Sequence, residues 1–121
     1  MSVSTIDYWE EDSDEFYNID IGNTVSFDNQ RDWLNITSND VYNTMYERLI
    51  KAYNIGCDEV LFDNTDIQDY NSGFFISEYD NAYYLDTLVN DAHSFGLEVG
   101  AYDIDTYTSE SIENLFDFII Q

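Results

Sequence analysis

Hydrophobic residues change their spacing along the chain, and these changes predict alternating strands and helices. In residues 17–21 every second side chain is apolar, Gly22-Asn23 then interrupts the pattern, and Val25 and Phe27 resume it. Alternation on both sides of two turn-forming residues is typical of a β-hairpin, here over about residues 15–27. The segment that follows has no clear period.

Apolar residues at helical spacing predict amphipathic helices. The first helix occupies about residues 40–54; it begins at Ser38 or the asparagine after it and ends before Gly56. The second begins at Ser77 or an aspartate three residues later and ends before Gly96. Small polar residues favour helix N-termini and glycine favours the residue after a helix, so both ends of each segment support these limits.

Short apolar runs between the helices predict further strands at residues 59–63, 74–76 and 97–104. The order helix, glycine, strand occurs twice, over residues 49–63 and 88–103. This weak repeat favours a mixed fold over an all-helical bundle.

The complete pattern predicts an α+β fold, with a small antiparallel or mixed sheet and three amphipathic helices, which two small αβ units could share. The last helix begins at Ser109 and is expected to bury Ile112, Leu115, Phe116 and Ile119. Residues 15–121 are expected to form one domain, with a subdivision allowed near residues 56–75. Residues 1–14 are polar and acidic without a period, so we expect a frayed or loosely docked arm.

Charge is distributed very unevenly. The chain has 26 acidic and 3 basic residues, a formal net charge of −23, and no lysine or arginine after Lys51. Duplex DNA carries one negative charge per about 1.7 Å of axis, so this charge corresponds to roughly 39 Å of duplex, close to the diameter of a folded chain of this length. The match predicts a DNA mimic, a protein that fills a DNA-binding groove in place of nucleic acid.

Strong acidity also occurs in proteins that do not imitate DNA. A disordered acidic chain is excluded by the 11 tyrosines, 8 phenylalanines and 2 tryptophans. A halophilic protein, an acidic surface without special purpose, and an acidic protein that binds a basic partner without imitating DNA remain alternatives. Clustered acids also allow calcium or magnesium binding, although the arrangement Asp69-x-Asn71-x-Gly73 has its glycine one position early for an EF-hand loop.

Residues suited to catalysis are sparse. The single histidine, His93, is expected near the C-terminal end of the second helix, where the helix dipole favours a cation. Cys57 is expected to be a small buried hydrophobic residue, and no phosphate loop or hydrolase motif is present. The sequence therefore predicts neither enzymatic activity nor a cofactor. Because the N-terminus carries no signal-like apolar run, we expect a cytoplasmic protein in a bacterial host.

The carboxylates after residue 57 form the candidate site. In a DNA mimic they would steer a basic groove by long-range attraction and then pair with its lysines and arginines, without binding nucleic acid or a membrane. The proposed DNA-mimic surface consists of Asp58, Glu59, Asp63, Asp66, Asp69, Glu78, Asp80, Asp86, Asp91, Asp103, Asp105, Glu110 and Glu113.

Residues 58–93 resemble the central part of the ArdA antirestriction family. The resemblance rests on Asp66-Ile67-Gln68-Asp69-Tyr70, on Ile76-Ser77-Glu78-Tyr79, and on the amphipathic helix that follows. It implies a DNA-shaped inhibitor, able to form a homodimer, that occupies the DNA groove of a type I restriction-modification enzyme. A CRISPR nuclease or a DNA glycosylase is an alternative target. It also implies that Tyr70, Tyr79 and Leu85 are packing residues.

Overall fold

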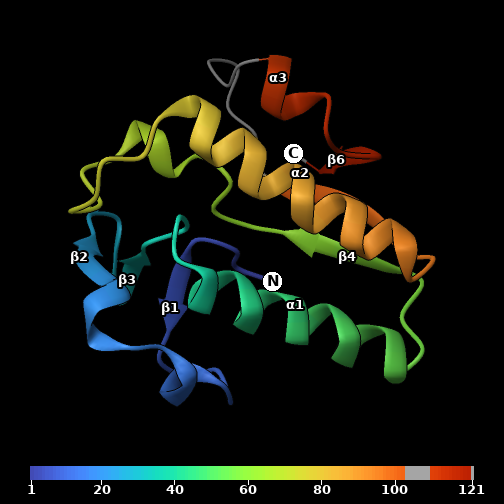
Figure 1. The fold of residues 1–121 in the computed structure, drawn as a ribbon, viewed down its shortest axis with the longest axis horizontal. Helices are drawn as coiled ribbons and strands as arrows, with labels where there is room; N and C mark the ends of the chain where they lie inside the picture. The colour runs from blue at the N-terminus through green and yellow to red at the C-terminus, as the bar shows by residue number, and fades with distance from the viewer. Residues whose placement is uncertain (103–109, 121) are drawn as a thin grey trace.

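Two small sheets of opposite kinds organise the chain (Figure 1). The computed structural model describes residues 1–102 and 110–120. An antiparallel sheet has the order β1-β3-β2, and a parallel sheet has the order β4-β5-β6. The strands are β1 (Thr5–Asp7), β2 (Ile21–Val25), β3 (Asp28–Leu34), β4 (Glu59–Phe62), β5 (Glu98–Tyr102) and β6 (Phe118–Ile120).

Three α-helices lie in the described residues: α1 (Asn39–Asn54), α2 (Glu78–Ser94) and α3 (Glu110–Glu113). Short 3-10 helices occupy Ser13–Glu15, Asn18–Asp20 and Ile67–Asp69. This mixture of helices with an antiparallel and a parallel sheet confirms the predicted α+β class.

The helix-glycine-strand repeat is present in three dimensions. Helices α1 and α2 run side by side in the same direction (Figure 1), and each is followed by a glycine with positive φ, 88° at Gly56 and 78° at Gly96. Each glycine returns the chain to a parallel strand, and Glu59 pairs with Glu98 at the start of β4 and β5. The short sequence match thus reflects two successive αβ units.

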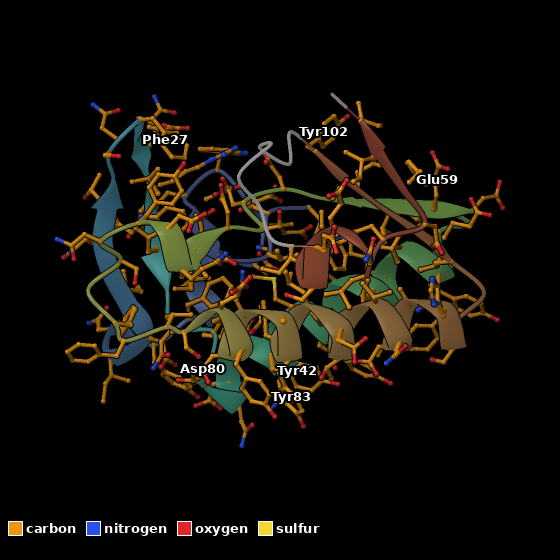
Figure 2. The ribbon with its side chains drawn as sticks, turned by 90° about the horizontal axis from the view of Figure 1, so that it is seen from above. Phe27, Tyr42, Glu59, Asp80, Tyr83 and Tyr102 are labelled. Atoms are coloured by element: carbon orange, nitrogen blue, oxygen red, sulfur yellow. The ribbon has the colours of Figure 1, made fainter. Side chains whose placement is uncertain are left out.

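The hydrophobic core lies between the parallel strands and the helices. Figure 2 shows α2 lying along one side of these strands. Burial alternates along β4, where Val60 and Phe62 are buried while Glu59 is exposed, and these side chains join the same core as Leu85 and Leu88 of α2. Because alternate strand residues point to opposite faces, one face of the sheet carries the core and the other remains partly open.

The N-terminal residues are part of this core rather than a loose arm. Residues 2–7 are all buried, and Ser2 pairs in parallel with Asp63 beside the end of β4. The terminal amine of Met1 donates to the Leu61 carbonyl, and the amide of Asp63 donates to the Met1 carbonyl. The expectation of a frayed arm was therefore wrong. The sequence did not indicate that residues 2–7 are buried, because this segment is short and includes polar side chains.

The predicted hairpin is wrong in register. Gly22 and Asn23 lie inside β2, and the chain turns at residues 26 and 27 instead. Tyr17 and Ile19, expected to face the core, are exposed. The glycine serves close packing here, because an added Cβ at Gly22 would stand 2.1 Å from the Ser72 carbonyl oxygen.

Several shorter segments also differ from expectation. Residues 74–76 form no strand, and Phe75 is fully exposed. The last helix ends at Glu113, and Ile119 lies in β6 rather than on a helix. Cys57 is exposed, whereas a buried side chain was expected. Among the described helices, none combines the length and apolarity that crossing a membrane requires.

Candidate functional site

Polar residues from both sheets meet where the parallel strands end. The antiparallel sheet lies beyond the C-terminal ends of β4 and β5 (Figures 1 and 2). Asp63 directly follows β4, and Asp7 is the last residue of β1. Arg31 stands opposite Asp7 in the β1–β3 ladder. Carboxyl ends of parallel strands are frequent positions for ligand sites in folds with parallel sheets.

The guanidinium of Arg31 is the centre of this group. Its Nε atom lies 3.2 Å from Asp7 Oδ1 and 3.4 Å from Asp28 Oδ2, and its Nη1 atom lies 3.9 Å from Asp63 Oδ2. The side chain of Arg31 is 20% exposed, and it stacks on Trp9 with 5.1 Å between the guanidinium carbon and the ring centroid. One cation therefore lies within 4 Å of carboxylates from three parts of the chain.

Asp7 occupies the most buried position of these carboxylates, with 3% of its surface exposed. Thr5 Oγ1 donates to Asp7 Oδ1 over 2.7 Å, and the Thr5 hydroxyl shares a hydrogen bond with Ser2. Burial raises the pKa of the Asp7 carboxyl, while the Thr5 hydrogen bond and the Arg31 charge oppose the increase.

Asp63 is more open, because 42% of its side chain is exposed. Its Oδ1 atom accepts from the backbone amide of Asn64 over 2.9 Å. Asn64 has φ of 58°, a left-handed conformation that residues other than glycine adopt uncommonly, and its amide side chain donates to Ser2 over 2.7 Å. Strained backbone that is held by neighbouring contacts is often found at functional sites.

Aromatic rings border the group on the antiparallel sheet. Trp9 is 55% exposed, and Tyr8 donates from its hydroxyl to Asp32, which raises the pKa of Tyr8 to about 12. Trp33 stacks on Tyr70 at 5.2 Å between ring centroids, and Phe27 meets the ring of Tyr70 edge-on. Trp9, which packs against Arg31, offers a flat apolar face next to this group.

Asp7 and Asp63 differ in burial and in the groups that surround their carboxyl groups. One carboxyl is buried with a raised pKa, and the other is half-open beside a cation and a backbone amide donor. Carboxyl groups in unlike environments can take different roles in acid–base chemistry. Asp7 is too buried to touch a large substrate, so its direct effect is on the position of Arg31.

A second charged hollow, of about 940 Å³, lies between the N-terminal loop and α1. Its cations are already paired, because Arg48 makes two hydrogen bonds to Asp12 and Lys51 lies 2.8 Å from Glu11. These contacts tie the loop to α1.

The structure scatters most of the predicted acidic residues. Among those in the described part of the chain, Asp63 is the one in contact with Arg31. Asp80 caps α2, since its carboxylate accepts from the Ser77 amide and its own amide donates to the Ser77 hydroxyl. Asp91 accepts from the Tyr42 hydroxyl. Asp58, Glu59, Asp69, Glu78, Asp86, Glu110 and Glu113 are exposed, Asp66 is half-buried, and Asp103 and Asp105 lie outside the described residues.

Sequence reasoning missed Asp7, Arg31 and Trp9. Arg31 is one of only three basic residues, and Asp7 ends a short apolar segment. Neither residue alone indicates a site. Their proximity follows from the strand register, which places these two residues, 24 positions apart in sequence, opposite each other.

Comparisons with known proteins identify a carbohydrate-active relative. The sequence model of glycoside-hydrolase family GH114 matches residues 1–121. The crystal structure of Aspergillus fumigatus Ega3 in complex with galactosamine superimposes with a TM-score of 0.89 at 28% sequence identity, and it covers 98% of this chain and 47% of its own. The chain thus spans about half the length of that protein. No curated protein matches the chain.

These findings overturn the DNA-mimic interpretation. The family match and the Ega3 likeness replace the ArdA resemblance, and they contradict an antirestriction function, a defence enzyme as the partner, and the absence of enzymatic activity. The resemblance rested on short motifs, and Tyr79, expected to be a packing residue, is 76% exposed. Negative charge alone was not sufficient evidence for a mimic of DNA.

Proposed function

The chain belongs to glycoside-hydrolase family GH114, and we propose that it acts in the hydrolysis of glycosidic bonds with Asp63 as a catalytic carboxylate. The position of Asp63 is the observation that carries the proposal. Its side chain follows a parallel strand, is half-open to a ligand, and is oriented by Arg31 and by the Asn64 amide.

The Asp63 side chain can act on a sugar in either of two ways. It can attack the anomeric carbon, or it can take a proton from the attacking water, while a second carboxyl group protonates the departing oxygen. Arg31 lies beside the Asp63 carboxylate in both cases. Asp7 contacts the guanidinium of Arg31 from the buried side. The guanidinium therefore lies between the buried Asp7 carboxylate and the half-open Asp63 carboxylate.

The substrate class that fits best is a chain of amino sugars. The related structure contains galactosamine, whose amine is protonated near neutral pH. A net charge of −23 attracts such a polycation and repels acidic polysaccharides. The acidic surface would therefore attract a cationic substrate, a role that requires no imitation of DNA.

The proposal is tested by incubating the purified chain with galactosamine oligomers and measuring new reducing ends and product masses. Wild type should cleave the oligomers, and Asp63→Asn should lose nearly all activity while its melting temperature stays close to that of wild type. Asp86→Asn is the matched control, since Asp86 is an exposed aspartate on α2.

The second carboxyl group is sought in the same assay with Asp66→Asn and Asp103→Asn, the next aspartate after Asp63 and the aspartate that follows β5 in sequence. Undiminished cleavage by Asp63→Asn, or a wild-type chain that leaves the oligomers intact, would contradict the assignment of Asp63.

A further inference from the structure

A groove lined by tyrosines lies between the N-terminal halves of α1 and α2, and Asp63 is not among its lining residues. Its volume is about 360 Å³, and its lining includes Tyr42, Tyr79, Asp80 and Tyr83. Figure 2 shows Tyr42, Asp80 and Tyr83 together on one side of the molecule, whereas Phe27 and Tyr102 lie on the other side.

The two tyrosines of α2 are unusually open for side chains of their size. Tyr79 is 76% exposed and Tyr83 is 68% exposed. They are four residues apart on one helix and therefore form neighbouring positions on its surface. Tyr84, next in sequence, is buried, so the core of α2 does not depend on the two exposed rings.

The groove is built on fixed elements. Tyr42 is held by its hydroxyl, which donates to Asp91, and burial together with this bond raises the pKa of Tyr42 to about 12. Asp80 is held by its capping interaction with Ser77. The polar rim also contains Thr37 and Ser38. A held ring with hydroxyl groups around it is suited to orient a ligand.

Charge selects the kind of ligand. No lysine or arginine lines the groove in the described part of the chain, while Asp80 does. A protonated amine is attracted to the face of a tyrosine ring and to a carboxylate, and the apolar face of a sugar ring packs on the same surface. An acidic ligand would be repelled by Asp80 and would meet no cationic side chain among the described lining residues.

We propose that this groove is a second binding site for a chain of amino sugars, distinct from the site at Asp63. The choice of ligand rests on the proposed function. Holding a polymer at two sites converts the second contact into an intramolecular one, so the groove raises the effective concentration of a long substrate at Asp63.

The test is calorimetric titration of galactosamine tetramer into Asp63→Asn, which removes hydrolysis from the measurement. Adding Tyr79→Ala and Tyr83→Ala should weaken binding about tenfold, as expected for losing two cation–ring contacts. The control adds Tyr17→Ala and Tyr53→Ala, two tyrosines more than half exposed elsewhere, and should change affinity less than about twofold.

N-acetylgalactosamine tetramer provides the charge control and should bind more weakly than the free amine at the groove. Equal affinity of the groove variant and the control variant would overturn the proposal, and so would equal binding of the two tetramers. Loss of self-association in the groove variant, without loss of sugar binding, would assign the groove to a second copy of the chain and also overturn it. Hydrolysis by the wild-type chain is measured separately, so failure of the groove and failure of Asp63 remain distinguishable.

Discussion

Arg31 connects the two sheets through Asp63, because its Nη1 atom on β3 lies 3.9 Å from the Asp63 Oδ2 atom at the end of β4. The same guanidinium contacts the buried Asp7. The position of the proposed catalytic carboxylate therefore depends on a residue of the antiparallel sheet.

Replacing Arg31 should reduce both hydrolysis and the stability of the fold. Arg31→Met removes the cation that orients Asp63 and leaves Asp7 buried without its partner, so we expect at least about a tenfold loss of kcat/KM, equivalent to ~1.4 kcal/mol, and a destabilisation of about 1 to 3 kcal/mol. Arg31→Lys keeps the charge but loses the forked geometry and should recover only part of the activity. Full activity in both Arg31 variants would show that catalysis by Asp63 does not depend on orientation by Arg31.

The pKa of Asp7 predicts a particular dependence of stability on pH. Because the folded-state pKa is raised above that of the unfolded chain, the native state binds the proton more tightly. The contribution of Asp7 to stability is therefore most favourable below the unfolded value of about 3.9 and decreases as pH rises through the folded pKa. Urea unfolding should show the wild-type chain gaining stability relative to Asp7→Asn as pH falls from 7 to 4. A constant difference would mean that Asp7 ionises normally.

Asp12 should show the opposite behaviour. Its hydrogen bonds from Arg48 lower the pKa of the Asp12 carboxyl. The resulting stability is present above the unfolded value of about 3.9 and is lost as pH falls through the folded pKa. Relative to Asp12→Asn, the wild-type chain should lose stability on acidification. If the wild-type chain instead gained stability relative to Asp12→Asn on acidification, as expected for Asp7, the environment assigned to Asp12 would be wrong.

Two glycines should differ in their tolerance of alanine. At Gly22 an added Cβ meets the Ser72 backbone carbonyl at 2.1 Å, whereas at Gly100 it meets the end of the Phe118 ring at 2.2 Å. A backbone atom yields less easily than a side chain, so Gly22→Ala should cost more, about 2 to 3 kcal/mol in the range known for overpacking. Phe118→Leu should relieve Gly100→Ala in a double-mutant cycle. Equal destabilisation by the two alanine substitutions, with no recovery of stability on adding Phe118→Leu, would show that these contacts are wrongly assigned.

Added salt should affect folding and binding in opposite directions. Screening of the −23 net charge reduces self-repulsion, so the melting temperature should rise between 0.01 and about 0.15 M salt, as the Debye length falls from about 30 to 8 Å. The affinity for galactosamine oligomers should fall over the same range. Binding that is independent of salt would argue against recognition by charge.

Parts of this fold were predictable because local sequence determines them. The period of α2, its cap at Ser77 and the glycine after it define that helix without reference to the rest of the chain. The hairpin was misplaced because Gly22 is selected by contact with Ser72, fifty residues away. Asp63 was a predicted site residue, but only as one member of a field of charges; its pairing with Arg31 arises from strand pairing and tertiary contact, which composition does not encode.

The most direct measurement is a crystal structure of Asp63→Asn with a bound galactosamine oligomer. The proposed function predicts a glycosidic linkage with its anomeric carbon about 3 to 3.5 Å from the side chain of residue 63, the distance of a reactive arrangement, and Arg31 in contact with that side chain. An oligomer bound at full occupancy with every linkage remote from residue 63 would contradict the assignment of Asp63 as the catalytic carboxylate.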